Sequence, residues 1–303
     1  FALPEVESRS RLNPPRMPAA MPLYRLILTA LLLVFCSLSL SAEETPRPIR
    51  VGMTPAFLHD QHAMLAEWKI YLESKLKRPV VFVQRDSYRE TMDLIQKDAL
   101  DFAWLCDYPY LVLGSEVRLL SVASYKGKPA YQSYLIVPSS DTQSKSIADL
   151  KGKVFAYADP HSNTGYVVPR YLLKKAGKDA STFFRRTFFT WSHHKAVQAV
   201  ASGLAQGAAV DSYVWETLQR VNPALVAKTR VIWKSPEYGF PPIVAQHKVG
   251  SKDFAEFQTV LFNMHRDPAG RALLEKLNLD GFVGGSPRMY QEVVEMMRVL
   301  GDS

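Results

Sequence analysis

The chain has few cysteines and, beyond its first 42 residues, no long apolar run. Only Cys36 and Cys106 occur among the 303 residues. Because we expect Cys36 to leave with an N-terminal signal, the remaining chain cannot form an intramolecular disulfide, and core burial must hold the fold. No stretch after residue 42 approaches the roughly 20 apolar residues that a membrane-spanning helix needs.

A dense basic cluster is also missing. The 37 Lys and Arg residues outnumber the 29 Asp and Glu residues, which gives a formal charge of +8. These residues are scattered and form no nucleic-acid-binding motif, so we expect no nucleic-acid partner. The basic excess is compatible with an anionic ligand but does not by itself indicate one.

The first 42 residues predict an upstream segment followed by a signal peptide. Residues 1–16 are polar. From Met21 onward come a positive Arg25, an apolar stretch at 26–40 and a small-residue cleavage site ending at Ala42. A retained membrane anchor is the alternative, but the stretch is too short to span a bilayer. A lipid anchor at Cys36 is disfavoured because the large Phe35 precedes it.

Strands and helices alternate through the rest of the chain, which predicts parallel sheets covered by helices. Two successive series, with no Pro/Gly/Ser-rich linker between them, indicate two lobes. The last helices can pack only on the first lobe, so the chain should cross twice, near 132–138 and 231–247, through a two-strand hinge. The fold class is therefore α/β, two-lobed, with mostly parallel sheets. We assign 43–135 to lobe 1, 136–232 to lobe 2 and 233–303 to a return into lobe 1.

The most informative segment runs from Asp159 to Pro169, with the sequence Asp-Pro-His-Ser-Asn-Thr-Gly-Tyr-Val-Val-Pro. It follows a predicted strand and opens a predicted helix at 164–176. The first-turn N–H groups of a helix have no intrahelical partner, so they and the hydroxyls of Ser162 and Thr164 could hold an oxyanion. An ordinary capped helix explains the same spacing.

This segment resembles the Asp-Pro-x-Ser-x-(Ser/Thr)-Gly-(aromatic)-x-x-Pro signature of the phosphonate/phosphite/phosphate-binding proteins of ABC transporters. That family consists of periplasmic binding proteins with a two-lobed α/β fold. Three further matches extend the resemblance over most of residues 50–245. They are the Ser-Ile-x-Asp-Leu-Lys-Gly-Lys segment at 146–153, the His-x5-Ala-Val-x2-Gly helix from His193, and the Asp-hydrophobic-Ala-Trp strand at 101–104.

The resemblance implies ligand contacts on the second lobe. Ser162, Asn163, Thr164 and Gly165 would bind the oxyanion, and Gly165 would let the ligand approach the backbone. His193 would donate a hydrogen bond from across the site, the alternative being a solvent-facing histidine at a helix start.

Asp211 and Tyr213 lie in a segment where the resemblance predicts contacts with the ligand's substituent. Relatives that bind aminoalkylphosphonates need acidic groups for the ammonium, but Tyr213 and Pro241 stand where those acids would lie. The resemblance therefore disfavours an amine-bearing ligand. Asp211 would either accept a proton from a protonated oxyanion or cap the following helix.

On the first lobe, Trp104 lies at the end of a predicted strand, where ligands bind in such sheets. Some relatives place a tyrosine soon after this Trp; here Tyr108 or Tyr110 would serve. Phe57 would either line the cleft or have only a packing role. We interpret Cys106 as a small buried residue rather than a reactive thiol.

Other functions have weaker support. Ser162, His193 and Asp211 could be drawn as a catalytic triad, but Ser162 lacks the Gly-x-Ser-x-Gly elbow, so we expect no enzyme and no cofactor. A metal site would need more ligands than His59, Asp60 and His62. We expect a periplasmic monomer that passes a small oxyanion to an ABC permease in the inner membrane. A ligand sensor that signals to a membrane-bound kinase or other regulator is the alternative.

Overall fold

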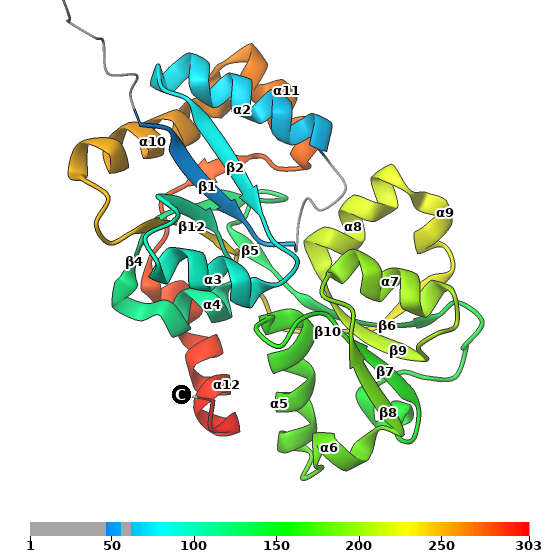
Figure 1. The fold of residues 1–303 in the computed structure, drawn as a ribbon. Helices are drawn as coiled ribbons and strands as arrows, with labels where there is room; N and C mark the ends of the chain where they lie inside the picture. Colours follow the sequence, from blue (N-terminus) through cyan, green and yellow to red (C-terminus); the bar gives the residue numbers. More distant parts are fainter. Residues whose placement is uncertain (1–46, 56–61, 303) are drawn as a thin grey trace, which may run out of the picture. The chain divides into compact units, whose positions relative to one another are not determined.

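The computed structural model describes residues 47–55 and 62–302 (Figure 1). The predicted signal peptide, Cys36, Phe57, His59 and Asp60 lie outside these residues. In the described part of the chain, every helix is too short or too polar to cross a bilayer.

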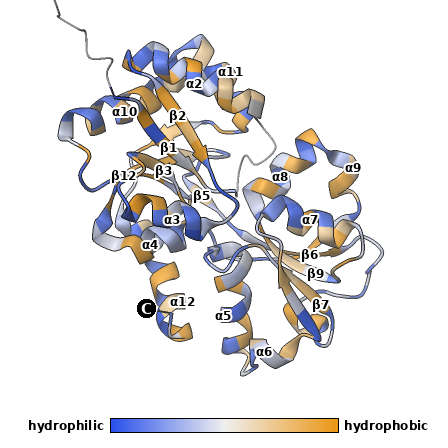
Figure 2. Ribbon diagram, in the orientation of Figure 1, coloured by the Kyte–Doolittle hydropathy of each residue, from blue (hydrophilic) through white to orange (hydrophobic). Residues whose placement is uncertain are grey.

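The first lobe is built on a sheet with the strand order β13-β4-β12-β3-β1-β2. Its strands are β1 (Ile49–Met53), β2 (Val80–Gln84), β3 (Phe102–Trp104), β4 (Val117–Ser124), β12 (Pro242–Gln246) and β13 (Gly281–Val283). Figure 2 shows these strands largely in hydrophobic colours, as expected for strands covered on both faces.

Helices from both ends of the described chain cover this sheet. α2 (His62–Leu76), α10 (Ser251–Asn263) and α11 (Pro268–Leu277) lie on one side, and α3 (Tyr88–Gln96) and α4 (Asp107–Leu113) on the other (Figure 1). Trp68 of α2 packs on Trp104 and Phe282, with ring centroids 6.0 and 6.1 Å away. The last helix is α12 (Gln291–Leu300), and short 3₁₀ turns occupy Gly114–Glu116, Met264–Arg266 and Pro287–Tyr290.

The second lobe is built on a sheet with the strand order β10-β6-β9-β7-β8. Its strands are β6 (Ser133–Pro138), β7 (Val154–Tyr157), β8 (Arg186–Phe189), β9 (Gly207–Asp211) and β10 (Thr229–Lys234). The helices are α5 (Val168–Lys175), α6 (Ala180–Phe183), α7 (His193–Ala201), α8 (Ser212–Val221) and α9 (Pro223–Val226), with a 3₁₀ turn at Ile147–Leu150. α5 also contacts α12 of the first lobe.

The two-lobed α/β fold predicted from the sequence is confirmed, but both sheets are mixed rather than mostly parallel. β1 pairs in parallel with β2 and β3, and β7 with β8 and β9. Within these two sheets, the antiparallel pairs all involve β4, β6, β12 or β13. Three of these strands, β4, β6 and β12, flank the chain crossings, where the chain arrives from the other lobe without a βα unit to set a parallel direction.

The two crossings pass side by side. The chain leaves the first sheet after β4 and enters β6, and it returns from β10 to β12. Between them, β5 (Ala130–Tyr131) pairs antiparallel with β11 (Tyr238–Gly239). Ser133 and Ser235 exchange two hydrogen bonds through the Ser133 N–H and the Ser235 N–H. This pairing matches the predicted two-strand hinge, while the exact lobe boundaries stay a prediction.

Gly270 in the first turn of α11 allows a test of the packing. A Cβ at this position would lie 2.2 Å from the Met264 carbonyl oxygen. Gly→Ala inside a helix normally stabilises by about 1 kcal/mol, but here we expect Gly270→Ala to destabilise the fold by roughly 1–3 kcal/mol through overpacking. Urea denaturation would measure this. Gly281→Ala is the control, since its Cβ would meet nothing closer than 3.8 Å, and equal stability of the two variants would contradict the packing.

Candidate functional site

The helix that follows β7 begins with a wide turn. Ser162 is its N-cap, and its Oγ accepts a hydrogen bond of 3.0 Å from the Gly165 N–H. Residues Asn163–Val167 form a π-helical turn before α5 starts. Ser162, Asn163 and Thr164 have no exposed surface. π-Turns are rare and often occur at functional sites.

Pro169 accounts for the geometry of this turn. Proline has no N–H, so the Gly165 carbonyl loses the donor that a regular helix would supply from position 169, and the Thr164 carbonyl loses the donor that would continue the π pattern. The Ser133 hydroxyl donates to the Thr164 carbonyl at 2.7 Å, and the Ala158 N–H donates to the Gly165 carbonyl at 3.3 Å. The helix start is thereby bonded to the end of β7 and to the hinge strand β6.

His193 lies against this helix start and is buried, not solvent-facing. Its Nδ1 accepts a hydrogen bond of 3.1 Å from the Asp211 N–H. Burial lowers the pKa of His193 to about 3, so the ring is neutral at physiological pH. A neutral ring whose Nδ1 accepts must carry its proton on Nε2, which lies 3.2 Å from Ser162 Oγ. Ser162 Oγ therefore accepts from His193 and from Gly165.

Asp211 ends β9 and caps α8. Its Oδ1 accepts from the N–H groups of Tyr213 and Val214, at 2.7 and 3.3 Å. Capping, one of the two predicted roles, is thus observed. Burial raises the pKa of Asp211 to about 8 despite these hydrogen bonds. A carboxyl of this kind keeps its proton near neutral pH and can donate it to an anionic oxygen.

The first lobe contributes a buried carboxyl that contacts the helix start directly. Asp107 Oδ2 accepts a hydrogen bond of 2.8 Å from the Asn163 side-chain amide. Its Oδ1 accepts from the Tyr131 hydroxyl at 2.8 Å and from the Cys106 thiol at 2.9 Å. The Asn163 amide also reaches the Tyr131 oxygen at 3.4 Å, which closes a ring of three hydrogen bonds. Burial raises the pKa of Asp107 to about 6.

A second contact between the lobes involves the start of α3. The Tyr88 N–H donates to Asp159 Oδ2 at 3.1 Å. The Tyr88 phenol is fully buried and lies beside Ser162. Burial raises the pKa of Tyr88 well above its ordinary value, and the contact with Ser162 offsets only part of this rise. Among the described residues, the Thr164 hydroxyl has no hydrogen-bond partner, and the Tyr88 hydroxyl has no neighbour of this kind but Ser162. Such buried orphan donors are costly unless a bound acceptor satisfies them.

Gly165 is surrounded by the protein itself. A Cβ there would lie 2.4 Å from the Ala158 Cβ, and 3.0 Å from both the His193 ring and Ser162 Oγ. The missing side chain of Gly165 therefore leaves room for Ala158, His193 and Ser162, and it lets His193 reach Ser162.

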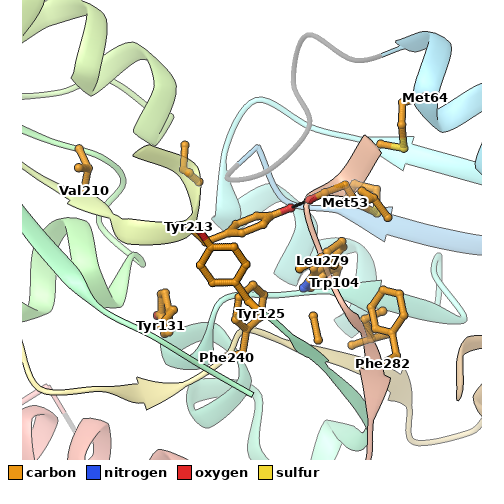
Figure 3. Close-up of a cluster of buried hydrophobic side chains, with 14 of the residues drawn as sticks. Met53, Met64, Trp104, Tyr125, Tyr131, Val210, Tyr213, Phe240, Leu279 and Phe282 are labelled. Carbon is orange, nitrogen blue, oxygen red and sulfur yellow. Dashed lines mark hydrogen bonds between the residues drawn. The ribbon is translucent and has the colours of Figure 1, made fainter. Parts of the chain in front are cut away.

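The other predicted contacts lie further from Ser162. Tyr213 is buried with its ring edge-on to Tyr125 and Phe240, and its hydroxyl donates to the Leu277 carbonyl (Figure 3). The Trp104 indole N–H donates to the Pro241 carbonyl at 3.0 Å, within the core of the first lobe. Tyr108 is half-buried with its ring 6.2 Å from the His161 ring.

Three residues of this site were missed in the sequence: Tyr88, Asp107 and Tyr131. The first has a local signal, because Ser87 and Glu90 form a capping box that places Tyr88 in the first turn of a helix directly after a strand. Asp107 is the third residue after β3, at the carboxyl end of the strand, where ligands bind in such sheets. Tyr131 lies in the hinge and has no such signal.

Comparison with known proteins identifies a family for the chain. The model of the family described as ABC transporter, phosphonate, periplasmic substrate-binding protein matches residues 51–290. The phosphonates-binding periplasmic protein of Escherichia coli is 25% identical over 256 residues, 81% of this chain and 74% of that protein. The phosphate-import protein of Mycolicibacterium smegmatis is 24% identical over 235 residues, 73% of each. A Prochlorococcus marinus structure in complex with methylphosphonate has a TM-score of 0.77 at 20% identity, and the match covers 85% of this chain and 100% of that one.

Asp211 should make stability fall with rising pH. Its pKa is about 8 in the folded protein, against an ordinary 3.8, so the folded state keeps a proton that the unfolded state has lost. His193 has the opposite effect, but only below its ordinary pKa of 6.5. Between about pH 6.5 and 8 we expect the unfolding free energy to drop by about 1–2 kcal/mol.

Asp211→Asn should remove this drop while keeping the helix cap, because asparagine caps as well as aspartate. Denaturant titrations of both proteins at the two pH values would measure it. An identical pH dependence in the variant would show that Asp211 is ionised in the folded protein.

Proposed function

The chain belongs to the phosphonate periplasmic substrate-binding proteins of ABC transporters, and we propose that it captures a small phosphorus oxyanion of the phosphonate, phosphite or phosphate class and delivers it to an ABC permease. The family is one of transporter components, which favours transport over signalling to a kinase. The Escherichia coli and Mycolicibacterium smegmatis relatives, by their names, bind phosphonates and import phosphate.

The observation that carries the proposal is the set of buried donors around the helix start at Ser162. The Thr164 hydroxyl is unpaired among the described residues, and the hydroxyls of Tyr88 and Ser162 lie beside each other. They come from both lobes, and all can donate to anionic oxygens. The positive end of the helix dipole adds to their attraction.

Neutral groups do this binding. Among the described residues, no Lys or Arg side chain hydrogen-bonds to Ser162, Asn163, Thr164 or His193. The ligand would exchange its water for fixed hydroxyls and N–H groups when the lobes close about the hinge. No covalent step is needed, so we propose binding without catalysis.

The fourth substituent on phosphorus would face the aromatic cluster of the hinge. Phe240 lies 5.8 Å from Tyr131 and 5.3 Å from Tyr213, measured between ring centroids. These rings favour a small or apolar substituent. An ammonium group would find no free carboxylate at Asp107, because both of its oxygens already accept hydrogen bonds from protein groups.

The remaining parts of the proposal concern the protein's setting. We propose export with removal of the signal peptide at Ala42, a monomeric state and no nucleic-acid partner. The family's location in the periplasm supports the export step.

A ligand panel tests the function. Calorimetry against phosphite, phosphate, methylphosphonate and aminoethylphosphonate should show binding of at least one of the first three, with aminoethylphosphonate the weakest because its ammonium would lose its water in a buried site lined by hydrogen-bond donors. The absence of binding to all four would overturn the proposed function. Tightest binding of aminoethylphosphonate would overturn the specificity alone.

Ser162→Ala tests the helix start. Loss of its hydroxyl should weaken the best ligand of the panel about 10- to 100-fold, since hydrogen bonds to charged groups contribute about 1.5–3 kcal/mol. The variant also loses a helix cap. Ser286→Ala is the matched control, because the Ser286 hydroxyl caps a short helix elsewhere by accepting from the Arg288 N–H. Equal affinity of the Ser162 variant and the control would contradict the proposed contact.

A further inference from the structure

The site contains one buried acceptor among its donors. Asn163 Oδ1 is buried and has no hydrogen-bond partner among the described residues. An oxyanion that carries no proton cannot satisfy Asn163 Oδ1, because the ligand oxygen and Oδ1 are both acceptors and would repel each other. A ligand oxygen that retains a proton can donate to it. The orientation of this amide therefore bears on which anions bind.

Asp107 determines that orientation. Both donors of the Asn163 amide are used, one by Asp107 Oδ2 at 2.8 Å and one by the Tyr131 oxygen at 3.4 Å. Turning the amide over would place Oδ1 against the Asp107 carboxylate, which is an acceptor only. The Tyr131 hydroxyl cannot relieve this, because its proton is donated to Asp107 Oδ1. The carboxylate of Asp107 thus keeps the nitrogen of Asn163 toward the first lobe and the oxygen away from it.

We propose that Asp107 is a positioning residue that turns the Asn163 amide oxygen toward the ligand, so that the site selects oxyanions that retain a proton over those that have lost every proton. This inference rests on the proposed function, because it names the substrate class of the same site. Phosphonate, phosphite and phosphate keep or readily take up a P–OH proton near neutral pH. Sulfonates and sulfate keep none, although their size and tetrahedral shape are similar.

The groups around Asp107 explain why it can fill this role. Cys106 and Tyr131 donate to it directly, and Asp211, Tyr238 and Tyr290 are the other titratable groups whose charge it affects. None of these is a cation. Its pKa of about 6 means that the carboxylate form prevails at neutral pH and is lost in mild acid, whereas Asp211 and His193 change charge at about 8 and about 3.

Methylphosphonate and methanesulfonate form a matched pair of probes, since both present three oxygens and one methyl group. Calorimetry on the purified protein at about pH 6.5 should give methylphosphonate an advantage of about 100-fold or more, the cost of an unsatisfied buried acceptor facing a charged ligand. Lowering the pH to about 5 should reduce this ratio severalfold, because protonated Asp107 no longer fixes the amide. Both probes remain monoanions in that range, so the change would come from the protein.

Asp107→Asn tests whether the carboxylate fixes the orientation of the Asn163 amide. An amide at position 107 can donate or accept, so either orientation of Asn163 is compatible with it. We expect the ratio to fall about 10-fold and its pH dependence between 5 and 6.5 to vanish. Ser286→Ala is again the control, because Ser286 caps a short helix elsewhere, and it should preserve both the ratio and its pH dependence. Asn163→Ala removes the acceptor itself and should lower the ratio to the same extent even if the Asp107 variant does not fold.

The outcomes are distinguishable. If the protein binds methylphosphonate but the Asn163 variant, or a folded Asp107 variant, keeps the full ratio, the inference is wrong and the proposed function stands. If the wild-type protein binds both probes equally, the selectivity is absent and the inference fails. If it binds neither methylphosphonate nor the other phosphorus oxyanions, both proposals fail together.

Discussion

The hydrogen bond between the Asp107 carboxyl and the Asn163 amide joins the two lobes where the helix after β7 begins. It is buried, as are the groups around it, so each of them needs a partner. Tyr131 and Cys106 satisfy the rest of Asp107. Asp159 supplies a second link by accepting from the Tyr88 N–H. Removal of either carboxyl would leave several donors unpaired at once.

These links also show how the described part of the site could attract an anion through uncharged groups. His193 is kept neutral by burial, and its proton is directed to Nε2 by the Asp211 N–H. Hydroxyls and N–H groups that are fixed before the ligand arrives need little reorganisation, and in a buried site their dipoles are weakly screened. Discrimination between ligands then depends on where donors and acceptors point, more than on the amount of charge.

The fold and one half of the site could be predicted from the sequence because their signals are local. Strand-helix alternation gave the two lobes, and the segment from Asp159 to Pro169 carries its own cap, hydroxyls and glycine. The first-lobe half could not be predicted in the same way. Asp107 and Tyr131 belong to the site only through hydrogen bonds to residues 24 and 56 positions away, and Trp104, which a strand-end argument favoured, packs into the core instead. The mixed sheets were missed because strand direction after a crossing has no sequence signature.

The missing N–H of Pro169 has an effect beyond its own helix. The carbonyl that it leaves unpaired, that of Thr164, is bonded to the Ser133 hydroxyl on β6, and the backbone of Ser133 is paired with Ser235 on the second crossing. A single chain of hydrogen bonds therefore runs from the helix start at Thr164 to both strands of the hinge. A displacement of this helix start would pull on both hinge strands, because one proline withholds the N–H that would otherwise keep the carbonyl within its own helix.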